Sequence, residues 1–344
     1  MKILILFLST CSFLYADVSW RNILKKKTVW YGSKEASDIA GKVMLYQREN
    51  GGWPKNQDMS DDLSKSDRKK LRKKRDELED TTIDNGATHT PLRFLTRVWK
   101  QKAGPTIEAS LHQGLSFLLK SQYSNGGWPQ RRHDSGYGRH ITYNDGAMIG
   151  VMAFLRDLLQ EGPSFLTSVE KEQIKEALTK GLDCLLKSQI RIDAKPTVWC
   201  AQHDRKTLLP AKARSYEHPS FSGGESAGIV KYLMQIKDPS PEVRAAIEGA
   251  VTWLDQHKIE GIVIERKDGN RIVTHKKDAP VLWARFYDLK TARPIFSGRD
   301  GIIKFSFDEI EAERRNGYAW YVGNPRSILE KDYPKWKESL KDSP

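Results

Sequence analysis

The fold of this chain is decided by a stretch that reads Leu118-Leu119-Lys120-Ser121-Gln122-Tyr123-Ser124-Asn125-Gly126-Gly127-Trp128-Pro129. An apolar helix end leads to Gln122, and a glycine turn brings the chain to Trp128 six residues later. Related copies end at Gln47, which precedes Gly51-Gly52-Trp53-Pro54, at Gln189, whose loop reaches Trp199, and, more weakly, at Gln256. Successive glutamines are 75, 67 and 67 residues apart. This period accommodates two helices and two loops, so the sequence predicts a repeated helical hairpin.

The segments between these copies have the apolar spacing of helices. They cover residues 88–98, 146–159, 169–186, 223–234 and 243–253. The last of them follows Asp238-Pro239-Ser240-Pro241, which is typical of a helix start. Repeated hairpins can bury their apolar stripes only against neighbouring hairpins. We therefore predict an all-α fold, an α/α toroid-like barrel.

Two departures from helix are expected in the last third of the chain. A small β-hairpin should pair residues 261–265 with 271–275 through Asp268-Gly269, a dipeptide that favours a tight turn. Residues 285–326 are rich in loop-forming residues and are expected to pack over one mouth of the toroid.

The N-terminus resembles a secretory signal. Lys2 precedes an apolar run, and Ala16 offers a small residue for cleavage. The run is too short to span a membrane, and a lipoprotein anchored at Cys11 is the alternative. We predict a signal peptide at residues 1–16 and a single catalytic domain at 17–344. The expected product is a secreted or periplasmic monomer without a stable membrane span.

The charge of the chain suggests an acidic partner. It has 57 basic and 44 acidic residues, a formal net charge of +13. For an exported protein this favours an acidic polysaccharide over nucleic acid. The basic run at residues 65–75 is expected to be a solvated helix face or loop. Cys184 and Cys200 remain after signal removal, and the sequence leaves open whether they pair. No Cys/His spacing suggests zinc.

Two similar polar motifs precede predicted helices. They are Thr82-Ile83-Asp84-Asn85-Gly86-Ala87 and Tyr143-Asn144-Asp145-Gly146-Ala147. Each places an acid and an amide before Gly-Ala, which would also suit simple N-capping. Because both motifs occur at corresponding corners beside the Gly-Gly-Trp-Pro loops, we predict a shared site. Carboxylate and amide oxygens suit calcium, a hard cation, although the spacing is not that of an EF-hand.

A third polar segment, Ala213-Arg214-Ser215-Tyr216-Glu217-His218, enters a predicted helix through a loop rich in proline and glycine. Arginines follow at positions 285, 293, 299, 314 and 315, interleaved with aromatic residues. Guanidinium groups bind carboxylates through two parallel hydrogen bonds, and aromatic rings stack on sugar faces. A chain of uronic acids would use both kinds of group.

These segments together resemble the family-10 pectate lyases. The matching stretches are residues 50–56, 82–88, 141–146, 213–217, 285–288, 293–296 and 299–301, and the resemblance covers roughly residues 35–330. It implies β-elimination of α-1,4-polygalacturonate, with calcium bridging substrate to acidic residues and an arginine as the base. The expected products are 4,5-unsaturated oligogalacturonates.

Individual roles follow from the matched positions. The resemblance implies that Arg214 is the base and that Asp84 and Asp145 hold calcium (Ca²⁺), with Asn85 beside them. It also implies that Arg299 and either Arg314 or Arg315 bind substrate carboxylates. We further expect Arg293 and Trp128 to contact the substrate.

Other functions remain possible at this point. An inverting glycoside hydrolase on the same toroid would use Asp84 and Asp145 as acid and base. A non-catalytic acidic-polysaccharide-binding protein would need the cations without a base. A terpene cyclase shares Gln…Trp repeats, but the chain has no convincing acidic ionisation motif. Among bases, His218 competes with Arg214, because a free arginine has a pKa above about 12 and must be depressed to act.

Overall fold

The computed structural model describes residues 18–132 and 135–341. Its longer helices are α1 (Lys34–Tyr46), α2 (Lys65–Lys73), α3 (His89–Gln101), α4 (Pro105–Ser121), α5 (Ala147–Glu161), α6 (Ser168–Ser188), α7 (Gly223–Leu233), α8 (Pro241–Gln256), α9 (Ala312–Gly317) and α10 (Tyr333–Ser339). The five helical segments expected from apolar spacing correspond to α3, α5, α6, α7 and α8. The predicted signal peptide lies outside the described residues, so export and the proposed chain division stay predictions.

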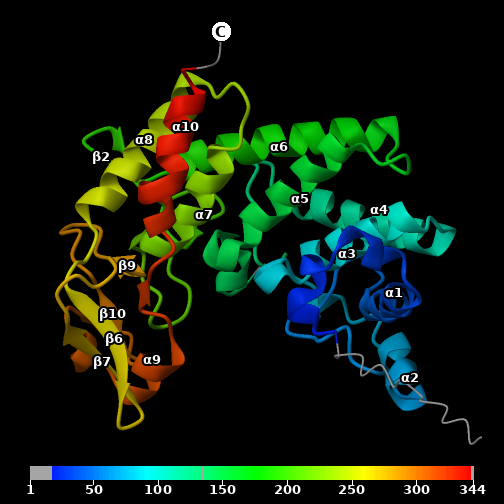
Figure 1. The fold of residues 1–344 in the computed structure, drawn as a ribbon, viewed down its shortest axis with the longest axis horizontal. Helices are drawn as coiled ribbons and strands as arrows, with labels where there is room; N and C mark the ends of the chain where they lie inside the picture. The colour runs from blue at the N-terminus through cyan, green and yellow to red at the C-terminus, as the bar shows by residue number, and fades with distance from the viewer. Residues whose placement is uncertain (1–17, 133–134, 342–344) are drawn as a thin grey trace, which may run out of the picture.

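The helices pack as hairpins in two rows. Pairs α3–α4, α5–α6 and α7–α8 each form one hairpin, while α3, α5 and α7 touch along one row and α1, α4, α6 and α8 along the other. In Figure 1 this double row runs from α1 on the right, past α5 and α6, to α7 and α8 on the left. The large buried core lies between the rows. The all-α, toroid-like fold predicted from the repeat is confirmed.

Each repeat is joined to the next by its glutamine. The side-chain amide of Gln122 donates to Gly126 O in its own loop and to Ala177 O in α6. Gln47 and Gln189 make the same pair of bonds, to a loop carbonyl and to a carbonyl of the following outer helix. Because each amide satisfies two backbone acceptors, the repeated glutamine ties a helix end, a loop and a neighbouring helix together.

The repeat tryptophans fill the core at the helix ends. The indole Nε1 atoms of Trp53, Trp128, Trp199 and Trp283 donate to Val43, Leu118, Leu185 and Leu254 carbonyls at 2.9, 2.8, 2.8 and 2.7 Å. All four side chains are fully buried. Trp283 therefore completes the fourth, weak repeat, which the sequence showed only as far as Gln256. The expectation that Trp128 contacts substrate is wrong, because no face of its ring reaches solvent.

Helix boundaries follow their capping residues. Ser240 Oγ accepts from Val243 N, and Pro241 begins α8, as the sequence predicts. Thr167 and Glu170 form a capping box at the start of α6. Helix α2 has no buried residue, which confirms the solvated helix face expected for this basic segment.

Short helical turns connect these helices. They are η1 (Trp20–Lys25), η2 (Thr28–Gly32), η3 (Leu78–Asp80), η4 (Asp84–Gly86), η5 (Tyr137–Arg139), η6 (Asn144–Gly146), η7 (Phe307–Glu309) and the π-helical η8 (Ile328–Asp332). The last of them packs with α10 and touches α7 and α8, so the C-terminal segment covers the final hairpin.

The strands are short and pair in twos. They are β1 (Ile141–Thr142), β2 (Arg191–Ile192), β3 (Lys195–Pro196), β4 (Gln202–His203), β5 (Phe221–Ser222), β6 (Ile262–Lys267), β7 (Asn270–His275), β8 (Trp283–Ala284), β9 (Phe286–Tyr287), β10 (Phe296–Ser297), β11 (Ile303–Lys304) and β12 (Tyr321–Val322). Strands β6 and β7 form the predicted hairpin: Lys267 pairs with Asn270, and Asp268-Gly269 turns with φ of 48° and 78°.

The C-terminal loops have a core of their own. Phe286, Phe296 and Trp320 are buried together there, joined by Phe307 and Tyr216. Pairing of β5 with β9 attaches this unit to the start of α7, and Figure 1 shows it below the last hairpin.

Two further findings concern the cysteines and the membrane. Cys184 and Cys200 are both buried free thiols, so they do not pair with each other. Within the described ranges, the chain forms no helix with the length and apolar character needed to cross a bilayer.

Candidate active site

The two polar motifs fold into matching turns that pack against each other at the starts of α3 and α5. Their central residues, Asn85 and Asp145, have φ of 50° and 51°, a left-handed conformation that asparagine and aspartate tolerate better than most residues. Gly86 and Gly146 continue with positive φ. The turns thus correspond residue by residue, which aligns Asp84 with Asn144 and Asn85 with Asp145.

The two carboxylates occupy different positions in the matching turns, since Asp84 is the first residue of its turn and Asp145 is the second. Asp84 is buried, and its Oδ2 is paired with the Lys55 ammonium from the Gly-Gly-Trp-Pro loop. The Asp84 backbone N–H donates to Thr82 Oγ1 at 3.1 Å. Asn85 is exposed, and its amide donates to Asn56 Oδ1 at 3.2 Å. The motif Trp53-Pro54-Lys55 therefore supplies a cation for the Asp84 carboxylate, a partner that sequence spacing alone did not identify.

Arg285 joins the second turn to helix α7. Its Nη2 donates to Asn144 Oδ1 at 2.9 Å and to Glu225 Oε1 at 2.8 Å, and lies 3.3 Å from Asp145 Oδ1. The guanidinium also lies over the Tyr318 ring, 4.7 Å from its centroid. Burial alone would lower the pKa of Arg285, but Glu225, Tyr318 and Asp145 outweigh burial and raise the pKa. Arg285 therefore remains a cation.

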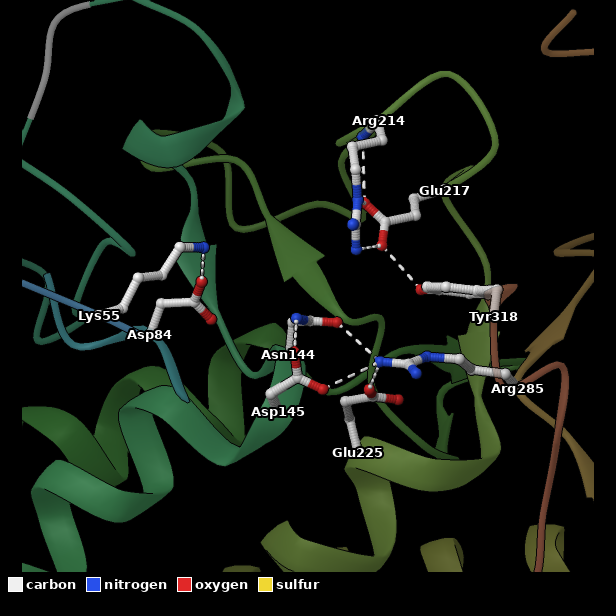
Figure 2. A network of polar contacts seen from close by, with 9 residues as sticks. All are labelled: Lys55, Asp84, Asn144, Asp145, Arg214, Glu217, Glu225, Arg285 and Tyr318. Atoms are coloured by element: carbon white, nitrogen blue, oxygen red, sulfur yellow. Dashed lines mark hydrogen bonds and ion pairs between the residues drawn. The ribbon is translucent and has the colours of Figure 1, made fainter. Parts of the chain in front are cut away.

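Arg214 is linked to Tyr318, the residue under Arg285, through Glu217. Glu217 Oε2 accepts from Arg214 Nε at 2.8 Å, and Oε1 accepts from Nη2 at 2.5 Å. Oε1 also accepts from the Tyr318 hydroxyl at 2.7 Å. Figure 2 shows three groups of polar side chains in one close view: Arg214 with Glu217, Asn144 with Asp145, and Lys55 with Asp84.

The charge states of Arg214 and its neighbour His218 differ. Hydrogen bonding to Glu217 raises the pKa of Arg214 above its ordinary value. Burial, helped by Lys212, lowers the pKa of His218, whose Nε2 lies 3.2 Å from Ser297 Oγ. In the free protein at neutral pH, Arg214 is therefore a cation and His218 is neutral.

Arg299 and Arg314 share one carboxylate. Glu313 accepts from Arg299 Nε and Nη2 at 3.1 and 2.9 Å, and from Nε of Arg314 at 2.7 Å. These two arginines hold the pKa of Glu313 at about 2, with Arg314 the stronger influence. A single carboxylate thus lies between two guanidinium groups, which is the contact expected for a uronate.

The remaining predicted arginines lie elsewhere. Arg315 Nη1 donates to the backbone carbonyls of Ile310 and Asp308 at 2.5 and 3.2 Å, so it braces the loop before α9. Of the two adjacent arginines, Arg314 is therefore the one beside Arg299. Arg293 is exposed, and its guanidinium lies 4.6 Å from the centroid of the Phe305 ring.

The oxygen donors at the two turns fit a calcium ion in chemical type. Asp84 and Asp145 supply carboxylates, and Asn85 and Asn144 supply amides. Within residues 18–132 and 135–341, no group of three or more His, Cys, Asp or Glu side chains could hold a metal ion together. Among the described residues, the turns therefore do not form a complete metal site by themselves. A cation binding there would compete with Lys55 and Arg285.

A helical-hairpin toroid that carries acidic turns and several arginines has the charged groups that an enzyme acting on an acidic polysaccharide would use. The family model for pectic acid lyase matches residues 47–329. A family 10 polysaccharide lyase from Cellvibrio cellulosa is 31% identical, with a TM-score of 0.78 over 89% of this chain and 94% of that chain. A mutant of that lyase in complex with trigalacturonic acid gives the same identity and TM-score over 95% of its length.

The chain therefore belongs to the pectic acid lyase family, and it is a pectate lyase. No sequence among curated proteins matches it. The resemblance inferred from the motifs is confirmed, and lyase chemistry replaces the hydrolase, cyclase and binding-protein alternatives.

Proposed function

We propose that this enzyme cleaves α-1,4-polygalacturonate by calcium-assisted β-elimination and releases 4,5-unsaturated oligogalacturonates. The observation that carries the proposal is the series of contacts that links Arg214, through Glu217, Tyr318 and Arg285, to the turn of Asn144 and Asp145 (Figure 2). The similar lyase in complex with trigalacturonic acid supports the choice of sugar.

The reaction needs a base and cationic groups. A base removes the proton on C5, which is acidic because it adjoins the uronate carboxylate. The electron pair forms the C4–C5 double bond, and the C4–O bond breaks, so the leaving sugar carries away the oxygen and then gains a proton. Cationic groups on the carboxylate stabilise the charge that develops as the C5 proton leaves. Arg285, Arg299 and Arg314 are the cations that we propose for this purpose.

Calcium is proposed at the turns that contain Asp84 and Asp145, with Asn85 nearby. When bound, it would act as a Lewis acid on the substrate carboxylate. The described protein offers only part of a coordination shell, so we propose that metal and substrate bind together. Lys55 holds Asp84, and Arg285 holds Asn144, before either ligand arrives.

Arg214 is proposed as the proton acceptor. Its pKa is raised in the free protein, which opposes this role. Deprotonation therefore requires the bound cation and the neighbouring arginines to lower the pKa, as like charges do. His218 is the competing base, since it is already neutral at pH 7.

The two bases predict different pH profiles. With Arg214 as the base, turnover rises well into the alkaline range, whereas His218 would give a plateau above roughly pH 7. We expect Arg214→Ala and Arg214→Lys to lose about 10²–10⁴-fold in kcat, read from the absorbance of the unsaturated product. The lysine variant fails because it keeps a charge but not the guanidinium shape.

His218→Ala is the matched control and should keep most of the turnover. Trigalacturonic acid should still bind to Arg214→Ala, which a calorimetric titration would measure. Substantial turnover by Arg214→Ala beside an inactive His218→Ala would transfer the role of the base to His218.

A further inference from the structure

Glu217 is not itself a candidate base or metal ligand, but its carboxylate accepts several hydrogen bonds from neighbouring residues. It is 3% exposed. It accepts hydrogen bonds from Arg214 at the backbone N, Nε and Nη2, and a fourth from the Tyr318 hydroxyl. Four donors satisfy the acceptor capacity of a carboxylate, so Glu217 has no capacity left to bind a sugar.

The same contacts restrict the Arg214 guanidinium. Nε and Nη2 are both held by Glu217, and the rings of Tyr216 and Tyr318 lie 5.1 and 5.5 Å from the guanidinium carbon. Among the residues that the structure describes, none is recorded in a hydrogen bond or ion pair with Nη1. The Arg214 side chain is nevertheless 41% exposed. Nη1 is thus the guanidinium nitrogen that Glu217 does not hold.

We propose that Glu217 is a positioning residue, which clamps Arg214 so that Nη1 is the nitrogen presented to the substrate. This inference rests on the proposed role of Arg214 as the base. Proton transfer needs the donor and acceptor within hydrogen-bond reach, and an unrestrained arginine side chain would populate many rotamers. A bidentate contact to a buried carboxylate removes that freedom before substrate arrives.

The clamp also opposes deprotonation. The Glu217 anion raises the pKa of Arg214, and the nearby Tyr216 and Tyr318 act in the same direction. Other charges near the clamp are Arg314, 4.8 Å from the Tyr216 ring centroid, and Arg285, across Tyr318. Glu217 therefore has two separable effects on Arg214, one on its orientation and one on its charge.

Two substitutions separate these effects. Glu217→Asp keeps the negative charge but shortens the side chain, so the fork no longer reaches both nitrogens. We expect kcat to fall roughly 100-fold, the cost of misplacing a catalytic group by about 1 Å, with KM nearly unchanged and the alkaline limb in place. Glu217→Gln keeps the size but removes the charge and one of the two acceptor oxygens, so kcat should fall and the alkaline limb of its profile should also move to lower pH.

Glu311→Gln is the matched control. Glu311 carries the same charge and accepts from the Arg299 backbone N–H, without any recorded contact to Arg214 in the described chain. It should leave the pH profile in place, which excludes a general effect of losing one negative charge. Because Glu217 is buried, each variant is first checked for native circular dichroism and for an unchanged Kd for trigalacturonic acid.

The outcomes are distinguishable. If Arg214→Ala is inactive but both Glu217 variants keep wild-type kcat and an unmoved alkaline limb, the positioning role is overturned and the base stands. If Arg214→Ala retains turnover, the base assignment fails and the positioning role fails with it. The inference is supported if kcat falls for Glu217→Asp and if the alkaline limb of the kcat profile is displaced in Glu217→Gln but not in Glu217→Asp.

Discussion

Replacing Trp128 with phenylalanine tests whether this tryptophan is structural. The indole is fully buried, and its Nε1 donates to Leu118 O at 2.8 Å. Its ring also fits closely against α6, since a Cβ on Gly181 would lie 3.0 Å from the ring. Phenylalanine preserves most of the apolar contact but leaves the Leu118 carbonyl without its partner. Trp128→Phe should therefore destabilise the fold without changing substrate binding.

The magnitude follows from these two losses. An unsatisfied buried carbonyl costs about 1–3 kcal/mol, and the missing part of the indole adds about 1 kcal/mol of lost packing. We expect the free energy of unfolding to fall by about 2–4 kcal/mol, a large share of the roughly 5–15 kcal/mol of a typical domain. Urea unfolding followed by far-ultraviolet circular dichroism measures this difference.

Trp199→Phe is the matched control. Trp199 occupies the same place in the next repeat, with its Nε1 2.8 Å from Leu185 O, and it was never expected to contact sugar. Both variants should lose similar stability and keep KM for polygalacturonate within about twofold. A several-fold rise in KM for Trp128→Phe, with stability changed by less than about 1 kcal/mol, would refute the structural role.

Two further predictions concern the proposed metal and substrate. A chelator should abolish formation of the unsaturated product, and added calcium rather than zinc should restore it, because the donors at Asp84 and Asp145 are hard oxygens; full activity in excess chelator would contradict the calcium proposal. Methyl esterification should lower the rate on pectate, since each ester removes a charge-assisted contact worth about 1.5–3 kcal/mol. The Arg299→Gln variant should discriminate less between polygalacturonate and highly methylated pectin. Equal wild-type rates on these two substrates would argue against carboxylate recognition.

Much of the fold could be predicted from the sequence, because the patterns that indicate it involve residues close together along the chain. Gln122 donates to Gly126 O in its own loop, Trp128 donates to Leu118 O ten residues earlier, and the capping at Ser240 involves neighbours three residues apart. Apolar periodicity and turn chemistry depend on short stretches of chain. Those stretches predicted the hairpin repeat, the β-hairpin at Asp268-Gly269 and the solvated basic helix.

The candidate site was only partly readable. The motifs around Asp84, Asp145 and Arg214 could be recognised as polar segments that precede predicted helices. Glu217 is three residues from Arg214, a spacing that is compatible with the bidentate pair between them. Lys55 lies in the matching stretch at residues 50–56, but its pairing with Asp84 was not predicted. Which arginine accompanies Arg299 required coordinates, since Arg314 and Arg315 are adjacent in sequence yet contact different groups.

By itself, the sequence determined the helical repeat, the capped helix starts and the polar motifs, because each depends on interactions between residues close along the chain. Only the tertiary structure decided that Trp283 fills the fourth repeat position and that Arg285 bridges Asn144 and Glu225. These partners are 141 and 60 residues from Arg285. They meet because successive hairpins stack side by side. This stacking brings together loops that are far apart in the sequence, and no local pattern in either loop indicates the contact.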